Sequence, residues 1–138
     1  MTSKIAYGMT ERVNLPHERA VEVVTEALQH EGFGLLTTID VRKTMWEKLG
    51  EEFPDYVILG ACNPALAYMA LRDDINLGLM LPCNVVVRID PEDERTVVSI
   101  LDPMVMADLS RTEGLENVAR LAREKLERVL AEVKGVAP

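Results

Sequence analysis

Apolar and polar positions alternate in some segments of the chain and follow helical spacing in others. Short apolar segments, most of them with a period of two, predict strands over residues 5–13, 34–39, 56–60, 83–89 and 96–101. Apolar positions three and four apart predict helices that begin near residues 16, 41, 64 and 112. The predicted order is strand, helix, strand, helix, strand, helix, strand, strand, helix.

Cap and turn residues set the expected boundaries of these elements. Asn63 followed by Pro64 predicts a helix start, because Asn caps helices and Pro suits the first turn. The helix over residues 41–49 is expected to turn Met45 and Leu49 inward. Residues 73–82 are expected to form a partly buried loop or short strand, and residues 104–108 an irregular segment.

The fold class follows from the two adjacent strands near the end of the chain. Only a short polar segment, residues 90–95, separates the strands over 83–89 and 96–101, so they form an antiparallel hairpin. The helix over 112–133 has one apolar stripe, which is expected to face the core. We therefore predict an α+β fold with a mainly antiparallel sheet.

Length, charge and cysteine usage narrow the class of protein. The 138 residues suit one domain with a sizeable core, and 48% of them are hydrophobic. A net charge of −8 without a dense basic run disfavours nucleic-acid binding. The chain has neither a signal-peptide pattern nor a membrane-length apolar run, so no membrane partner is expected. Its two cysteines are expected to be free thiols in the cytoplasm.

The most unusual sequence feature is a repeated Cys-Asn pair, Cys62-Asn63 and Cys83-Asn84. Cys62 precedes a predicted helix start, where backbone N–H groups and the helix dipole favour a thiolate. Such a thiol could act as a nucleophile or redox centre, whereas the simpler interpretation makes both cysteines small buried hydrophobes. Cys62 and Cys83 are thus the candidate catalytic residues, with no assigned reaction.

Other chemistry has weaker support in the residues. No Cys-x-x-Cys pair exists, and His17 and His30 lie roughly 20 Å apart along one predicted helix, so no metal site is expected. Whether the protein holds a cofactor stays open. Asp102, before a proline, is more typical of a turn than of a catalytic acid. Met80 and other nearby methionines would fill the core or line a pocket or a dimer surface.

The Cys-Asn segments also carry a family resemblance. Residues 56–64 (YVILGACNP), 78–85 (GLMLPCNV) and the Asp102-Pro103 pair resemble the domain-of-unknown-function family numbered 302, and the resemblance covers nearly the whole chain. It implies a compact α+β domain in which helices pack on one side of an antiparallel sheet, similar to the β-α-β4-α arrangement of the TATA-binding-protein fold. It also implies a homodimer, but no reaction, because fold similarity carries no function.

Three hypotheses for the function follow. The first is a homodimeric module that binds a small, mostly apolar ligand beside Cys62 and Cys83, with Asn63, Met80, Pro82, Asn84 and Asp102 as candidate binding residues. The second is thiol chemistry at Cys62, with Cys83 as its partner. The third is a structural or interaction subunit. Whether the protein is an enzyme stays open.

Overall fold

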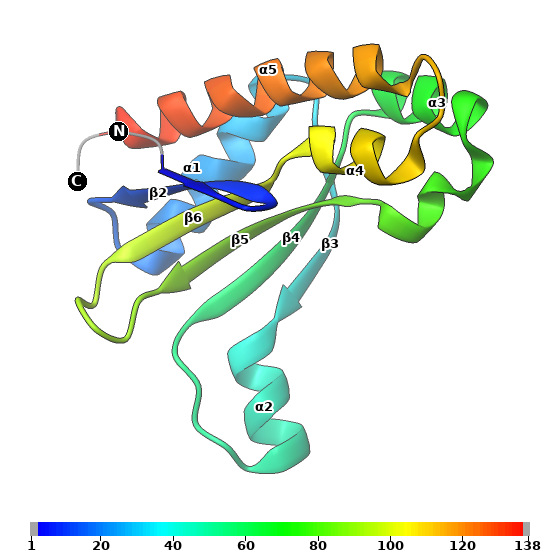
Figure 1. Cartoon of the computed structure of the whole chain (residues 1–138). Coiled ribbons are helices and arrows are strands. Elements are labelled where there is room, and N and C mark those ends of the chain that lie inside the picture. The colour runs from blue at the N-terminus through cyan, green and yellow to red at the C-terminus, as the bar shows by residue number, and fades with distance from the viewer. Residues whose placement is uncertain (1–2, 137–138) are drawn as a thin grey trace.

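A computed structural model describes residues 3–136 and contains a six-stranded antiparallel sheet (Figure 1). The strands lie in the order β1-β2-β6-β5-β4-β3. Their bounds are β1 (Ser3–Ile5), β2 (Gly8–Val13), β3 (Gly34–Asp40), β4 (Tyr56–Cys62), β5 (Cys83–Ile89) and β6 (Thr96–Leu101). The predicted hairpin is the β5–β6 pair, in which Val87 lies opposite Val98.

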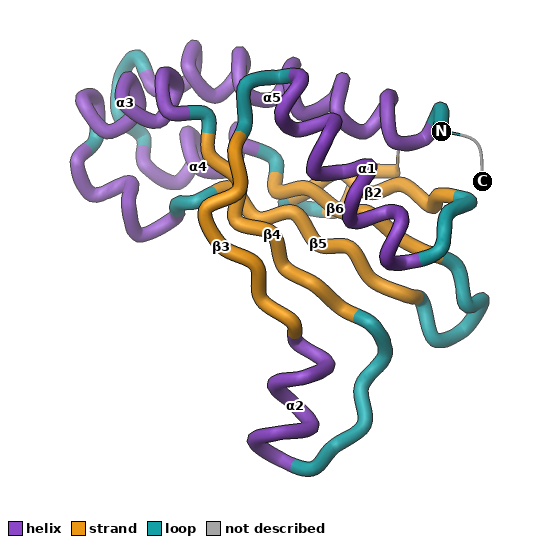
Figure 2. The backbone as a smooth tube through the Cα atoms, turned by 180° about the vertical axis from the view of Figure 1, so that it is seen from behind, coloured by secondary structure: helices purple, strands orange, loops and turns teal. Residues whose placement is uncertain are grey.

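Two helices cover one face of the sheet, as Figures 1 and 2 show from opposite sides. They are α1 (His17–His30) and α5 (Leu115–Lys134). The smaller helices α3 (Pro64–Asp73) and α4 (Pro103–Ser110), with the 3₁₀ helix η1 (Ile75–Met80), lie at one end of the sheet, and α2 (Val41–Leu49) projects from the other end. Without the short strand β1 and the inserted helices, the chain reads β2-α1-β3-β4-β5-β6-α5. The predicted α+β class is confirmed.

The main core lies between α1, α5 and the inner face of the sheet. Every apolar position that the helical period predicted for α1 is buried, and so is the whole apolar stripe of α5. Leu28 from α1, Leu126 from α5 and Val85 from β5 are completely buried in one cluster. Burial of such side chains is worth about 1.5–3 kcal/mol each, so this interface is a principal source of stability.

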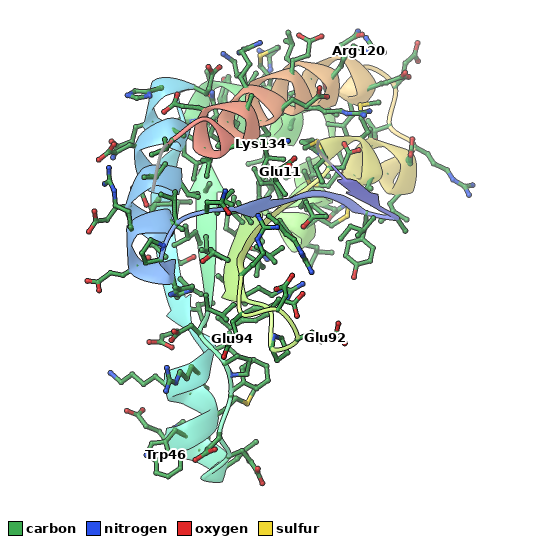
Figure 3. The ribbon with its side chains drawn as sticks, turned by 90° about the vertical axis from the view of Figure 1, so that its left-hand side faces the viewer. Glu11, Trp46, Glu92, Glu94, Arg120 and Lys134 are labelled. Carbon is green, nitrogen blue, oxygen red and sulfur yellow. The ribbon has the colours of Figure 1, made fainter. Side chains whose placement is uncertain are left out.

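Glu11 is a polar exception on the inner face of β2. Its side chain is only 5% exposed, and Lys134 Nζ from the end of α5 lies 3.0 Å from its Oε1 (Figure 3). A buried carboxylate needs a compensating charge because burial removes its hydration. The ion pair therefore fixes the last turn of α5 against the sheet.

Several predicted boundaries were wrong. The strand expected over residues 5–13 is split into β1 and β2, and Tyr7 lies exposed in the turn between them. Gly8 begins β2, and a Cβ at this position would come within 2.9 Å of the Ile100 backbone oxygen, so a larger residue would disturb the pairing of β2 with β6. The segment expected to be irregular after residue 103 is helix α4, and the segment expected to be a loop or strand before residue 82 contains η1. Helix α5 begins at Leu115 rather than near residue 112.

The expected inward orientation was wrong for Leu49, whereas Met45 is half-buried. Helix α2 has no buried residue, and Leu49 is 68% exposed. The predicted helix itself is present: the Asp40 carboxylate accepts a hydrogen bond from the Lys43 backbone N–H at 3.0 Å, and Gly50 ends the helix in a left-handed conformation. The pattern located this helix correctly, and the helix contacts β4, but its contacts leave only Val41 and Met45 half-buried and Leu49 exposed.

Candidate ligand-binding pocket

A second apolar cluster lies at the end of the sheet that carries α3, η1 and α4. Its residues line much of an open cavity of about 380 Å³ between the ends of β4 and β5, these helices and the first half of α5. The lining is almost wholly apolar and includes Phe33, Leu66, Ala70, Leu77, Met106, Leu115 and Val118. This volume falls within the range of ligand pockets in proteins, which is roughly 300–1,000 Å³.

Two capped helix starts build the walls of this pocket. Asn63 Oδ1 accepts a hydrogen bond from the Leu66 backbone N–H at 3.3 Å, and Pro64 follows in the first turn of α3. Asp102 does the same for α4, because its Oδ1 accepts from the Met104 backbone N–H at 2.9 Å. Each cap turns the chain from a strand directly into a helix, so a wall of the pocket begins where β4 or β6 ends.

Cys62 and Cys83 both line the pocket, on neighbouring strands. Cys83 lies opposite Ala61 in the β4–β5 register, so the next residue, Cys62, is close to it. Cys62 is half-buried and Cys83 is buried, and both are free thiols. Burial, with a smaller contribution from Cys62, raises the pKa of Cys83 to about 11. Cys83 is therefore a protonated, weakly polar part of the wall at neutral pH.

Pro82 lines the pocket beside Cys83, and a glycine makes room for it. A Cβ at Gly60 would lie 2.9 Å from Pro82 Cγ and would collide with the Thr37 hydroxyl. Only glycine lets the proline ring lie this close to β4. The glycine within the apolar run of β4 is thus part of the construction of the pocket.

The structure brings together some of the residues predicted as a site and separates others. Cys62, Asn63, Pro82 and Cys83 line one cavity. Asn84 is exposed in β5, and its neighbour Val85 is buried in the core, so Asn84 points to the opposite face of the sheet. Met80 packs against the apolar cluster without lining the cavity. Asp102 is only 4% exposed, and its carboxylate is used in the helix cap.

Sequence reasoning missed most of the wall that the helices supply. Leu115, Val118, Ala119 and Ala122 belong to the apolar stripe of α5, which was assigned wholly to the core. Residues further along the same stripe, such as Leu126, do pack in the main core. The available signal was the length of α5: 20 residues extend about 30 Å, so its stripe can cover both the sheet and a neighbouring cluster.

Residues 3–136 contain neither a metal-binding cluster nor a helix suited to span a membrane. No group of three or more His, Cys, Asp or Glu side chains is placed to hold a metal ion among them. None of the helices in this range is both long and apolar enough to span a membrane. The pocket offers two thiols and the amide of Asn63 as its polar groups, so its chemistry suits the exclusion of water from an apolar molecule.

These features define a class of protein: an α+β domain whose antiparallel sheet carries helices on one face and an apolar pocket at one end. The family model "Domain of unknown function DUF302" matches residues 9–133, and the chain belongs to this family. A solved structure, the uncharacterized conserved protein DUF302 from Bacillus stearothermophilus, is similar with 27% identity and a TM-score of 0.86. The similarity covers 94% of this chain and 99% of that one. The comparison with curated proteins gave no match.

Proposed function

We propose that this protein is a binding module for a small, mostly apolar ligand. The observation that carries the proposal is the cavity of about 380 Å³ with its apolar wall. An apolar cavity gains little from water, because water there would lack hydrogen-bond partners. Binding of an apolar molecule removes the surfaces of both partners from water, at roughly 25 cal/mol per Å² of apolar area.

The few polar groups of the wall support a ligand with one polar end. Cys62 is half-buried, and Asn63 Nδ2 makes only a long hydrogen bond of 3.4 Å to the Glu31 backbone oxygen. Both residues lie where β4 passes into α3, so the polar groups gather at one part of the wall. A ligand with a hydroxyl or carbonyl group at one end would match this distribution.

Thiol chemistry is the alternative function for the same pocket. It would need a thiolate, and the raised pKa of Cys83 opposes one at that position. The binding proposal treats Cys62 as part of the wall and requires only the shape of its side chain. The two functions therefore differ in what replacement of the Cys62 sulfur would do.

The proposal is tested by fluorescence titration with N-phenyl-1-naphthylamine, an uncharged apolar probe that emits strongly when it leaves water. We expect saturable binding of one probe per chain by the wild type and by Cys62→Ser. We also expect bound probe to slow the reaction of Cys62 with a maleimide, because the thiol lines the occupied cavity. Cys83 should react only after unfolding, since it is buried and protonated.

Two outcomes would contradict the binding proposal. One is the absence of saturable probe binding by the folded wild type. The other is probe binding that leaves the rate of Cys62 labelling unchanged, because the probe would then occupy a different surface. Cys83→Ser serves in the labelling experiment as the variant in which Cys62 is the only thiol.

The proposal extends to the compartment and the oligomeric state of the protein. We place the protein in the cytoplasm, whose reducing conditions suit the two free thiols. We also propose that it acts as a homodimer. The pocket is built from the residues of a single chain, so ligand binding itself needs no second copy.

A further inference from the structure

Asn63 caps a helix in the same way as three aspartates elsewhere in the chain. Within residues 3–136, side chains cap α2, α3, η1 and α4, and three of these caps are the carboxylates of Asp40, Asp74 and Asp102. Asn and Asp are about equally good at the N-cap, so the cap itself does not require an amide. The amide cap is also part of the pocket wall. An amide differs from a carboxylate because it is uncharged and carries N–H donors.

The two hydrogen bonds of Asn63 fix the orientation of its amide. Oδ1 accepts from the Leu66 backbone N–H at 3.3 Å, and Nδ2 donates to the Glu31 backbone oxygen at 3.4 Å. A reversed amide would set a donor against the N–H and an acceptor against the carbonyl, so only this orientation fits both partners. A Cβ at Gly32 would come within 3.0 Å of Nδ2, and the next residue, Phe33, lines the cavity. Nδ2 is thus held at the edge of the pocket.

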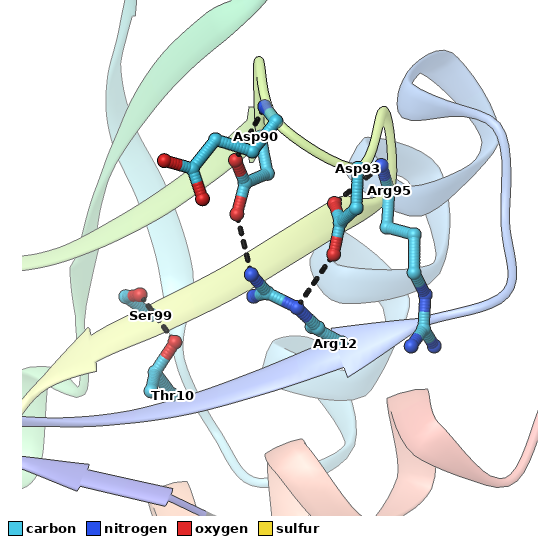
Figure 4. Close-up of polar contacts among 7 residues, drawn as sticks. Thr10, Arg12, Asp90, Asp93, Arg95 and Ser99 are labelled. Atoms are coloured by element: carbon cyan, nitrogen blue, oxygen red, sulfur yellow. Dashed lines mark hydrogen bonds and ion pairs between the residues drawn. The ribbon is translucent and has the colours of Figure 1, made fainter.

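One hydrogen of this amide has no partner within residues 3–136. Nδ2 carries two hydrogens, and its only hydrogen bond in that range is the long one to Glu31. A polar cluster on β2 and the β5–β6 turn is better satisfied: the Arg12 guanidinium binds both Asp90 and Asp93, as Figure 4 shows. A donor in an apolar cavity costs free energy unless a group accepts from it. The second N–H of Asn63 is therefore available to a ligand.

The polar side chains of the wall are donors rather than strong acceptors. Besides Asn63 they are the thiols of Cys62 and Cys83, which are weak in both roles. Because Asn63 Oδ1 is engaged in the helix cap, the strongest free group of the wall is the Nδ2 donor. Such a wall suits an oxygen that only accepts, as in a carbonyl group. A hydroxyl group would also need an acceptor for its own hydrogen.

The wall does not suit a charged ligand. The cavity is lined by residues of the described range 3–136, and none of them is Asp, Glu, His, Lys or Arg. Arg123, in the part of α5 that borders the pocket, lies 3.0 Å from Glu127 and 3.9 Å from Asp102. Arg128 pairs with Glu31 at 2.9 Å. A carboxylate in the cavity would lose its hydration without a compensating charge, so anions such as fatty acids are excluded.

We propose that the pocket takes an uncharged carbonyl compound, such as a ketone or an ester with an apolar chain, whose oxygen accepts a hydrogen bond from Asn63 Nδ2. This inference rests on the binding function proposed above and names the class of its ligand. The carbonyl group lies where β4 passes into α3, and the apolar part extends toward Leu115 and Val118. Asn63 thereby determines specificity, and this role is separable from the cap because Asp and Ser also cap helices.

Displacement of bound N-phenyl-1-naphthylamine by 2-nonanone, 2-nonanol and nonanoate tests the proposal at neutral pH. The three compounds share an unbranched nine-carbon skeleton and differ in their polar group. We expect the wild type to bind the ketone about three- to tenfold more tightly than the alcohol, whose own hydrogen stays unpaired. Nonanoate should bind at least about a hundredfold more weakly than the ketone, because its charge is not compensated.

Asn63→Asp keeps the cap and replaces the amide donor with a charged acceptor. It should bind the ketone about tenfold more weakly than the wild type and reverse the preference, so that the alcohol binds better. Asn63→Ser should remove the preference without reversing it. The infrared carbonyl band of bound 2-nonanone should lie at lower wavenumber in the wild type than in Asn63→Ser, because a hydrogen bond weakens the C=O bond. Asn84→Asp is the matched control, since it adds the same charge on the opposite face of the sheet, and it should bind like the wild type.

Equal affinity of the wild type for the ketone and the alcohol would overturn the proposal, and so would tight binding of nonanoate. A folded Asn63→Asp variant that keeps the wild-type preference would do the same, with thermal unfolding as the check on its fold. Should this variant not fold, the wild-type preference and the infrared comparison with Asn63→Ser decide. Failure of the binding function itself is a different result, in which the wild type binds neither the naphthylamine nor any of the three compounds, and it would remove this inference as well.

Discussion

Leu126→Ala is expected to lower the free energy of unfolding by about 2–5 kcal/mol. Leu126 is completely buried in the core between α1, α5 and the sheet. The substitution removes apolar contacts and leaves a cavity, because the surrounding helix and strands relax only in part. Urea unfolding followed by circular dichroism measures the loss. Domains of this kind are stable by only about 5–15 kcal/mol, so the effect is a large fraction of the total.

Two further variants separate this packing effect from a general sensitivity of α5 to substitution. Leu121→Ala changes a leucine of the same helix that is 45% exposed, and it should cost well under half as much as Leu126→Ala. Leu126→Met conserves the volume and should cost less than about 1.5 kcal/mol. Equal losses in the free energy of unfolding for Leu121→Ala and Leu126→Ala would contradict the assignment of the buried face of α5.

Ala67→Phe is expected to weaken binding of the apolar probe by roughly 10–100-fold, the effect of overfilling a packed apolar space by about 1–3 kcal/mol. Ala67 is half-buried in α3 and lines the cavity, so a phenyl ring there would occupy the space of the ligand. Its position near the start of α3, rather than in the main core, should leave the fold intact. The measurement is the probe titration described above.

Ala65→Phe provides the matched control for this prediction. Ala65 lies on the same helix, two positions away, but is exposed and does not line the cavity. We expect it to bind the probe as tightly as the wild type. Thermal unfolding of both variants checks that the fold is retained. Equal probe binding by Ala67→Phe and the wild type would show that the probe uses another surface.

The sequence predicted the main helices and strands well, because the spacing of apolar residues along each element indicates which of its sides is buried. The stripes of α1 and α5 are buried as expected, and so are Val85 and Val87 of the predicted inward face of β5, while Ile89 is half-buried. Helix α2 marks the limit of this reasoning. Its pattern has an apolar side, but which surface covers that side depends on tertiary or quaternary contacts that no local pattern contains.

The pocket was predicted only in part, for a related reason. Cys62, Asn63, Pro82 and Cys83 could be singled out because they stand at changes of chain direction. The Asp102-Pro103 pair has the same form as Asn63-Pro64, yet it was assigned to a turn and α4 was missed. Asn84 follows Cys83 as Asn63 follows Cys62, but β5 continues where β4 ends. Both cysteines therefore line the pocket, but of the two asparagines only Asn63 does, because Asn84 points to the opposite face of the sheet.

Native mass spectrometry of the protein, purified gently from cells, tests the pocket most directly. We expect chains that carry an additional non-covalent mass, lost on denaturation, in the wild type and in Ala65→Phe. Ala67→Phe should lack this mass because its cavity is filled. The same extra mass on Ala67→Phe, or wild-type chains that are bare and take up no apolar probe when it is added, would contradict the proposed binding function.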